Sequence, residues 1–290
     1  GVGKGALQAN TTASSNTAVG YESMLSNTTG SVNTAVGAYS LDANTTADNN
    51  VAVGFAALGV NTVGGNNTAV GTYALDANTT ASNNTGVGHQ ALTDTTTGYA
   101  NTAVGKNSLA NNTTGYDNVS IGADSMENNT TGHSNTALGM SALLANTTAN
   151  NNTAVGTDAL KANTTGDVNV AVGSLALDAN TTGSQNVAVG VHAMGDNTTG
   201  DYNTALGHQT LKANEGDYSV AVGALALQAN TTGDNNIGIG YSALNVNTTG
   251  ANNTAIGFGA LDAATTADDN TAVGYGAATA MTTGHSNVIV

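Results

Sequence analysis

Apolar and polar positions repeat along the whole chain with one dominant period. The glycine of each NTAVG-like box recurs every 17 residues from Gly3 to Gly207 and from Gly223 to Gly274, with a single 16-residue step between Gly207 and Gly223. We number the repeat from residues 67–83, NTAVGTYALDANTTASN, with Asn67 at position 1. Because a fixed period marks a repeat architecture, the sequence predicts one continuous array of about 17 coils over residues 1–290.

Each box predicts a short β-strand. Position 2 is always β-branched and position 4 is always Val, Ile or Leu, and β-branched residues at alternate positions are typical of a strand. We therefore expect the side chains of positions 2 and 4 to point into the core. At position 4 of the first boxes these residues are Val19, Val36, Val53 and Val70.

A second apolar position predicts a second short strand in each coil. Position 9 is Leu or Met in all but one repeat, and its first core residues include Leu41, Leu58 and Leu75. Glycine at position 5, and Gly or Ala at position 15, are expected at the corners, because a tight bend favours a residue without a Cβ atom. The first corner glycines are Gly20, Gly37, Gly54 and Gly71.

These features together predict an all-β solenoid, or β-roll. One 17-residue unit is too small to bury its own apolar side chains, whereas copies stacked in register share a core. With strands about 4.8 Å apart, the coils would form a rod on the order of 80 Å long. Asn fills position 1 in nearly every repeat and position 12 in most, and stacked asparagine side chains hydrogen-bond along a column.

Position 3 predicts a contact between chains. It is Ala, Gly or Ser in every box except the last, although on the expected strand it faces away from the core, where bulk and charge are tolerated. We interpret this restriction as close contact with another copy of the chain. The residues assigned to that contact are Ala18, Ala35, Ala52 and Ala69.

Charge and composition exclude several classes of binding partner. The chain carries 19 acidic and four basic residues, a net charge of −15, and has no Cys or Pro. Without a basic stripe it cannot displace the counterions of nucleic acid, and it has no apolar run of the roughly 20 residues that a membrane-spanning helix needs. We expect no nucleic-acid partner, no cofactor and no membrane insertion by this segment.

The NTAVG box, the AL pair and the NTTG turn resemble the head and stalk repeats of trimeric autotransporter adhesins (YadA-like heads), and similar repeats in phage-type tail-fibre proteins. The resemblance covers the whole chain, although the adhesin box is closer to S-V-A-I-G in a shorter unit. It implies a left-handed β-roll, three copies packed in parallel about one axis, and an extracellular location on a cell surface or virion. Both termini cut through a coil, so we expect a segment of a longer fibre without caps.

The motifs that could indicate a nucleotide, metal or glycosylation site are explained by the structural repeat. Gly1, Gly3 and Ala6 of GVGKGAL fit a dinucleotide-binding fingerprint, but the helix that such a site needs after the strand is not predicted. Asp268 and Asp269 match no calcium-loop spacing, and the five His residues have no metal-ligand spacing. The Asn-Thr-Thr glycosylation pattern, for example at Asn27, occupies one fixed position, which favours an asparagine ladder.

Aromatic residues are confined to positions 6, 7, 16 and 17. Two interpretations remain open: the rings shield the backbone of neighbouring coils, or they form a stripe that contacts a sugar or receptor, because Tyr combines an apolar face with a polar tip. The residues assigned to such a surface contact are Tyr21, Tyr39, Tyr73, Tyr241 and Tyr275.

The sequence therefore predicts a non-enzymatic fibre, and the resemblance implies that it is extracellular and trimeric. Identical loops along a rod would attach to a host glycan or surface receptor through many weak contacts. The alternative is a single-chain solenoid that acts as a surface filament or binds ice. An enzyme is disfavoured because every coil repeats the same residues and no position is chemically singular.

Overall fold

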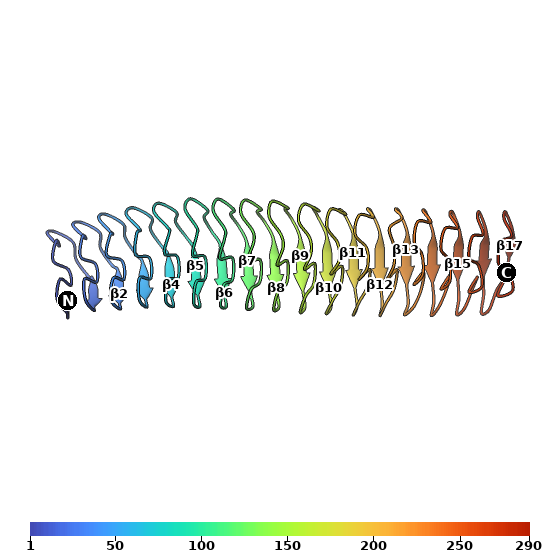
Figure 1. Ribbon diagram of the computed structural model, residues 1–290, viewed down its shortest axis with the longest axis horizontal. Coiled ribbons are helices and arrows are strands. Elements are labelled where there is room, and N and C mark those ends of the chain that lie inside the picture. The colour runs from blue at the N-terminus through green and yellow to red at the C-terminus, as the bar shows by residue number, and fades with distance from the viewer. The chain divides into compact units, whose positions relative to one another are not determined.

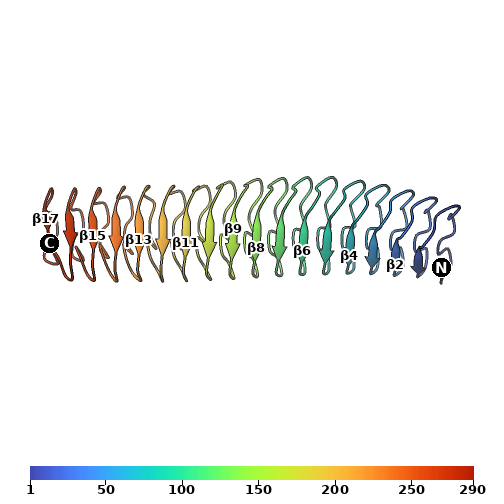
Figure 2. The same cartoon turned by 180° about the vertical axis from the view of Figure 1, so that it is seen from behind.

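The computed structural model describes all 290 residues and divides the chain into two compact units, Gly1–Ala149 and Asn150–Val290. Each unit is a β-solenoid in which every coil after the first contributes one short strand, and no helix forms (Figure 1). The view from behind shows the turns that connect successive strands within each unit (Figure 2). The predicted all-β solenoid of 17-residue coils is confirmed.

The strands are two or three residues long and fall on the boxes. The first unit contains β1 (Thr17–Val19), β2 (Thr34–Val36), β3 (Val51–Val53), β4 (Thr68–Val70), β5 (Thr85–Val87), β6 (Thr102–Val104), β7 (Val119–Ile121) and β8 (Thr136–Leu138). The second unit contains β9 (Thr153–Val155), β10 (Val170–Val172), β11 (Val187–Val189), β12 (Thr204–Leu206), β13 (Val220–Val222), β14 (Ile237–Ile239), β15 (Thr254–Ile256), β16 (Thr271–Val273) and β17 (Val288–Ile289).

Within each unit, consecutive strands pair in parallel and in register. Ala18 of β1 lies opposite Ala35 of β2, and the same positions pair in the following coils. The 16-residue step preserves this register, because Thr204 of β12 lies opposite Val220 of β13. The missing residue is therefore accommodated in the turn and not in the strand.

The second apolar position is not a strand, contrary to the sequence prediction. Positions 6–11 form turns, and Leu41, Leu58 and Leu75 have left-handed backbone angles with φ between 49° and 54°. Their N–H groups still bond to the next coil, as from Leu41 to the carbonyl of Ala57 at 3.0 Å. Position 9 thus forms a hydrogen-bond ladder between coils although its backbone is not extended. A left-handed backbone is uncommon for leucine, so the residue type does not predict it.

The strand faces are inverted relative to the prediction. The valines expected in the core lie on the outside: Val19, Val36 and Val70 are 40%, 37% and 36% exposed, and Val53 is half-buried. The alanines expected at a contact between chains, Ala18, Ala35, Ala52 and Ala69, are buried within their own coil. Because side chains alternate along a strand, an error of one position exchanges the two faces completely.

The physical reason for the inversion is the narrowness of the coil. Gly86 occupies position 3 of β5, and a methyl group added to it would lie 3.2 Å from the carbonyl oxygen of Ala91 and 3.5 Å from Cγ of Leu75. Position 3 therefore has room for Ala or Ser but not for Val. The opposite wall of the same chain, and not a second chain, restricts this position to small residues.

The core is a column of leucines and alanines, with asparagines at its margins. Leu41, Leu58 and Leu75 are fully buried, as predicted, and the alanine that precedes each position-9 leucine is buried in most coils. The corner glycines also lie where predicted. Gly37 has φ 136°, and a methyl group added to it would collide with the carbonyl of Gly54, so position 5 requires glycine.

The inverted faces give a direct prediction. Leu75→Ala removes a fully buried side chain and is expected to lower the free energy of unfolding by about 2–5 kcal/mol, whereas Val70→Ala on the outside should cost less than about 1 kcal/mol. Denaturant unfolding of the two variants measures the difference. A larger cost for Val70→Ala would contradict the placement of position 4.

Candidate functional site

The outward side chains of the strands form the most regular exposed surface of each unit. We call the residues at positions 2 and 4 of each coil the outer strand face. It is made of Thr, Val, Ile and Leu, with no charged residue in any strand of a chain whose net charge is −15. Ile121 and Leu138 are 38% and 46% exposed. Because side chains alternate along a strand, positions 2 and 4 point away from the core that position 3 enters.

Aromatic side chains from the same position of consecutive coils stack. Tyr241, Phe258 and Tyr275 all follow the position-5 glycine, and their rings stack at centroid distances of 5.3 and 5.2 Å with interplanar angles of 16° and 10°. Tyr99 and Tyr116, both at position 16, stack at 5.1 Å and 7°. The identical backbone of successive coils holds such rings parallel.

Aromatic side chains that alternate between two positions meet edge to face. Tyr21 and Phe55 are at position 6 and Tyr39 and Tyr73 at position 7, and neighbouring rings are inclined by 75° to 85° at 5.4 to 5.8 Å. The five tyrosines assigned to a surface contact therefore lie in two aromatic columns, one in each unit. Stacked rings cover each other's faces, so Phe258, which has a ring on both sides, presents mainly its edge to solvent.

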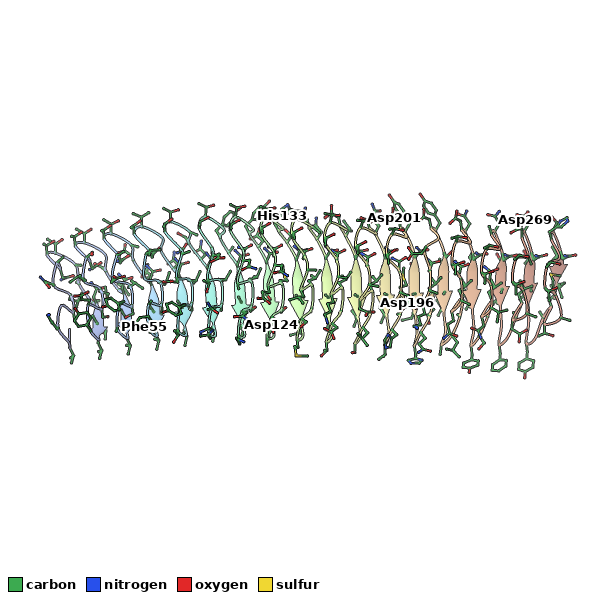
Figure 3. All side chains as sticks on the ribbon, viewed as in Figure 1. Phe55, Asp124, His133, Asp196, Asp201 and Asp269 are labelled. Carbon is green, nitrogen blue, oxygen red and sulfur yellow. The ribbon has the colours of Figure 1, made fainter.

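The aromatic columns at positions 6 and 7 lie at the edge of the coil opposite to the NTT turns. In the first unit, Figure 3 shows Phe55 and Asp124 at the edge where the strands end, with His133 at the opposite edge. His133 extends the Tyr99 and Tyr116 stack, with a ring centroid 4.6 Å from that of Tyr116. The variable residues of the repeat are thus concentrated along two edges.

Buried asparagines close each coil at one carbonyl. In the coil that contains β3, the side-chain amides of Asn50 and Asn61, at positions 1 and 12, both donate to the carbonyl of Gly64 at 2.9 Å. Asn61 also donates to Oδ1 of Asn44 in the preceding coil, and Oδ1 of Asn50 accepts the backbone N–H of Asn67 in the following one. The predicted ladders therefore run at both positions.

Three buried polar atoms lack a hydrogen-bond partner, and each marks a break in the position-12 ladder. They are Oγ1 of Thr95, Oδ1 of Asn197 and Oδ1 of Asn247. Thr95 stands in place of an asparagine, Asn197 precedes the 16-residue coil, and Asn247 precedes Ala264. The ladder is thus interrupted wherever the repeat itself departs from its pattern.

Glu215 accepts the hydrogen bonds that the shortened turn of the 16-residue coil would otherwise leave unmade. Its Oε1 accepts hydrogen bonds from the N–H and Oγ1 of Thr198 at 3.1 and 2.8 Å, and its Oε2 accepts from the N–H and Oγ1 of Thr199 at 3.0 and 2.9 Å. In a regular coil a threonine carbonyl accepts these N–H groups, as Thr62 does for Thr45 and Thr46. The carboxylate therefore replaces a missing backbone acceptor.

Two half-buried carboxylates face each other across a glycine in the first unit. A methyl group added to Gly59 would lie 3.2 Å from Oδ1 of Asp76 and 3.6 Å from Oδ1 of Asp42. Burial raises the pKa of both carboxyl groups above its ordinary value, and the neighbouring carboxylates of Glu22 and Asp76 raise the pKa of Asp42 further. These two groups bear charge at a cost to the fold.

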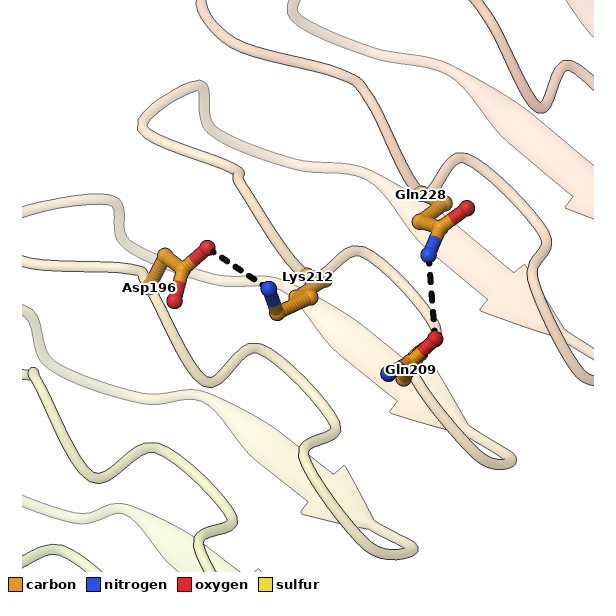
Figure 4. A network of polar contacts seen from close by, with 4 residues as sticks. All are labelled: Asp196, Gln209, Lys212 and Gln228. Atoms are coloured by element: carbon orange, nitrogen blue, oxygen red, sulfur yellow. Dashed lines mark hydrogen bonds and ion pairs between the residues drawn. The ribbon is translucent and has the colours of Figure 1, made fainter.

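The charged side chains form two ion pairs, Lys161 with Asp158 and Lys212 with Asp196. No group of three or more His, Asp or Glu side chains could hold a metal ion. In the second unit, Lys212 pairs with Asp196 at 3.3 Å, and Gln228 donates to Gln209 at 3.1 Å (Figure 4). An exposed ion pair of this kind contributes little stability.

One hollow of about 260 Å³ lies on the surface of the first unit. It is lined by Gln90, Thr93, Asp94, Asn107, Ala110, Asn111 and Glu127. Asn107 donates to Asp124 at 3.0 Å and Asn111 donates to Asn128 at 3.1 Å, so the amides there already have partners in the adjacent coil.

The motifs singled out in the sequence have structural roles. In GVGKGAL, Val2 bridges to Val19 and a turn without a helix follows. Asn27, Asn112, Asn163 and Asn230 of the Asn-Thr-Thr pattern are fully buried. Asp268 accepts from the N–H of Ala251 at 2.8 Å, and Asp269 accepts from the Asn252 amide at 3.1 Å. The exposure of positions 2 and 4 could not be predicted from residue type, because uncharged β-branched residues are equally typical of a buried strand face.

No protein-family model matches the chain, and no curated protein matches its sequence. The structure contains no helix long and apolar enough to cross a lipid bilayer.

Restoring the broken ladder should stabilise the protein. In Thr95→Asn the new amide can donate to Asn78 and Gly98, and its oxygen can accept from Asn112, so we expect a gain of about 1 kcal/mol in the free energy of unfolding. Thr97→Asn, at an exposed position of the same turn, is the matched control and should leave stability unchanged. Equal effects of the two variants in denaturant unfolding would rule the ladder out as the cause.

The pair across Gly59 predicts a pH dependence. A carboxyl group whose pKa is higher in the folded than in the unfolded chain binds more protons when folded, so stability falls as pH rises through the folded pKa. Asp76→Asn should therefore raise the melting temperature at neutral pH and flatten the fall in stability as the pH rises above about 4, the ordinary pKa of an aspartic acid. Asp117→Asn, on an exposed residue, is the control and should retain the slope.

Proposed function

We propose that the protein is a structural and adhesive fibre that self-associates, as a parallel homotrimer, through the outer strand face. The observation that carries the proposal is the outer strand face of each unit, which is uncharged and made of Thr, Val, Ile and Leu in an otherwise acidic chain. Monomeric proteins rarely leave large contiguous apolar surface exposed, and such surface commonly marks an interface. An identical copy presents an identical face at the same spacing between coils, which makes it the occupant that fits best.

In this proposal the loops make the adhesive contacts. The two edges of each coil carry the variable residues, including the aromatic columns, and these edges stay accessible when the strand faces meet. A repeated array of weak contacts gives attachment through avidity without a deep pocket. The resemblance to trimeric adhesin and tail-fibre repeats supports the same assignment, an extracellular location and a non-enzymatic role.

Native mass spectrometry tests the assembly. We expect a trimer for the wild-type chain and a folded monomer for the double variant Val70→Asp, Val104→Asp, because a charge on the outer strand face cannot be desolvated cheaply. The control is Thr80→Asp in the exposed NTT turn, which should remain trimeric. A monodisperse wild-type monomer would refute self-association, and a dimer would refute the threefold arrangement.

Attachment is measured with the same proteins. Beads coated with the wild-type chain should be retained on a mucin-coated surface more strongly than beads coated at the same chain density with the monomeric double variant, because only the assembly presents several sets of loops at one point. Equal retention of both at matched chain density would argue against a multivalent adhesive role.

Ice binding is the second candidate, and the outer strand face also favours it. Threonine at position 2 and valine at position 4 of many strands project hydroxyl and methyl groups to the same side, repeated at the spacing of parallel strands, about 4.8 Å. A face used in this way must be free in solution. Faceted ice crystals in the presence of a monomeric wild-type chain, lost on Val70→Asp, Val104→Asp, would support it, and unshaped crystals would exclude it.

A further inference from the structure

The chain has no cysteine, so its coils cannot be linked by disulfides. Its stability therefore depends on the hydrogen bonds and packing contacts that each coil makes with its neighbours. A covalent link between coils would have to come from another type of side chain. Tyrosine is the remaining residue type here whose side chains couple to one another on oxidation, and nine tyrosines are present.

Two pairs of tyrosines are stacked in consecutive coils without another ring between them. The Tyr99 and Tyr116 rings in the first unit are 5.1 Å apart and inclined by 7°. The Tyr202 and Tyr218 rings in the second unit are 5.0 Å apart and inclined by 13°. Tyr99, Tyr202 and Tyr218 are 48%, 46% and 56% exposed, and Tyr116 is half-buried. Both pairs are therefore held close and remain open to an oxidant.

Backbone hydrogen bonds fix the spacing of each pair. The N–H of Asp117, next to Tyr116, donates to the carbonyl of Tyr99 at 3.1 Å. The N–H of Tyr218 donates to the carbonyl of Asp201, next to Tyr202, at 3.2 Å. Since the two coils cannot move apart without breaking this ladder, the rings are kept adjacent, and proximity of this kind greatly favours coupling within one chain over coupling between chains.

The other tyrosines lack this arrangement. Tyr21 and Tyr39 are neighbours, but their rings meet edge to face at 75°. Phe55 separates Tyr39 from Tyr73, and Phe258 separates Tyr241 from Tyr275. The chain therefore contains its own internal controls.

We propose that Tyr99 with Tyr116, and Tyr202 with Tyr218, are sites of oxidative cross-linking to dityrosine. A haem peroxidase using hydrogen peroxide removes one electron and one proton from each phenol. The two phenoxyl radicals join through a carbon–carbon bond between their ortho (Cε) atoms, and each ring then recovers its aromaticity by moving the ortho hydrogen to the phenolic oxygen. Two tyrosines and one peroxide give one dityrosine and two water molecules, so peroxide is reduced as the two phenols are oxidised.

The product would be a covalent staple between adjacent coils. Each link closes a loop, of 17 residues between Tyr99 and Tyr116 and of 16 between Tyr202 and Tyr218. A cross-link that closes a loop restricts the unfolded chain in the way a disulfide does. The inference does not depend on the proposed assembly, because each pair lies within one chain.

Peptide mapping after treatment with a haem peroxidase and hydrogen peroxide tests the proposal. Trypsin cleaves after Lys106 and Lys212, so the partners of each pair fall on different peptides: 5–106 and 107–161 for the first, and 162–212 and 213–290 for the second. Peptides 107–161 and 162–212 each contain a single tyrosine, Tyr116 and Tyr202 respectively. We expect 5–106 joined to 107–161 and 162–212 joined to 213–290, each with the loss of two hydrogen atoms, in protein that migrates as a single chain in denaturing gels.

Phenylalanine variants provide the control, because they keep the stacked ring and remove the phenol. Dityrosine fluorescence should fall by about half in Tyr116→Phe and in Tyr218→Phe and be lost in the double variant, while Tyr39→Phe leaves it unchanged. Oxidation should raise the melting temperature of the wild-type chain but not of the double variant. Links confined to other tyrosines, links only between chains, or fluorescence that persists in the double variant would overturn the proposal.

Discussion

Most coils depend on the convergence of two buried side-chain amides on one backbone carbonyl. The asparagines at positions 1 and 12 both donate to the carbonyl at position 15, as Asn50 and Asn61 do to Gly64. A coil with a core of little more than one leucine and two alanines buries too small an apolar surface to fix its own path. The amides supply that constraint, because each is buried and would be costly to leave unpaired.

Stacking converts this local constraint into a regular surface. Because each coil repeats the backbone of the one before, a side chain at a given position meets its equivalent from the next coil. Identical positions give the parallel rings of Tyr241 and Phe258, and alternation between positions 6 and 7 gives the inclined rings of Tyr21 and Tyr39. The same rule places valine beside valine on the outside of the strands. The neighbours of a surface side chain in this fold are therefore set by the equivalent positions of adjacent coils more than by the other residues of its own coil.

Much of this could be predicted from the sequence, and the rest failed for identifiable reasons. The period, the strands, the corner glycines and the buried leucines follow from spacing and residue type. The direction of the strand does not, because alternation defines two faces without saying which one is inside. Hydrophobicity suggested Val70 for the core, whereas the room available at position 3 admits only a residue as small as Ala69. The left-handed backbone of Leu75 was also unpredictable, since that conformation is uncommon for leucine.

Glu215 shows that the coil length is less rigid than the repeat suggests. One carboxylate supplies acceptors for two N–H groups and two hydroxyls where a residue is absent, and the strands on either side keep their register. A coil that is one residue short is therefore compatible with its neighbours when a carboxylate stands in its turn, so coils of different length can follow one another in a single solenoid.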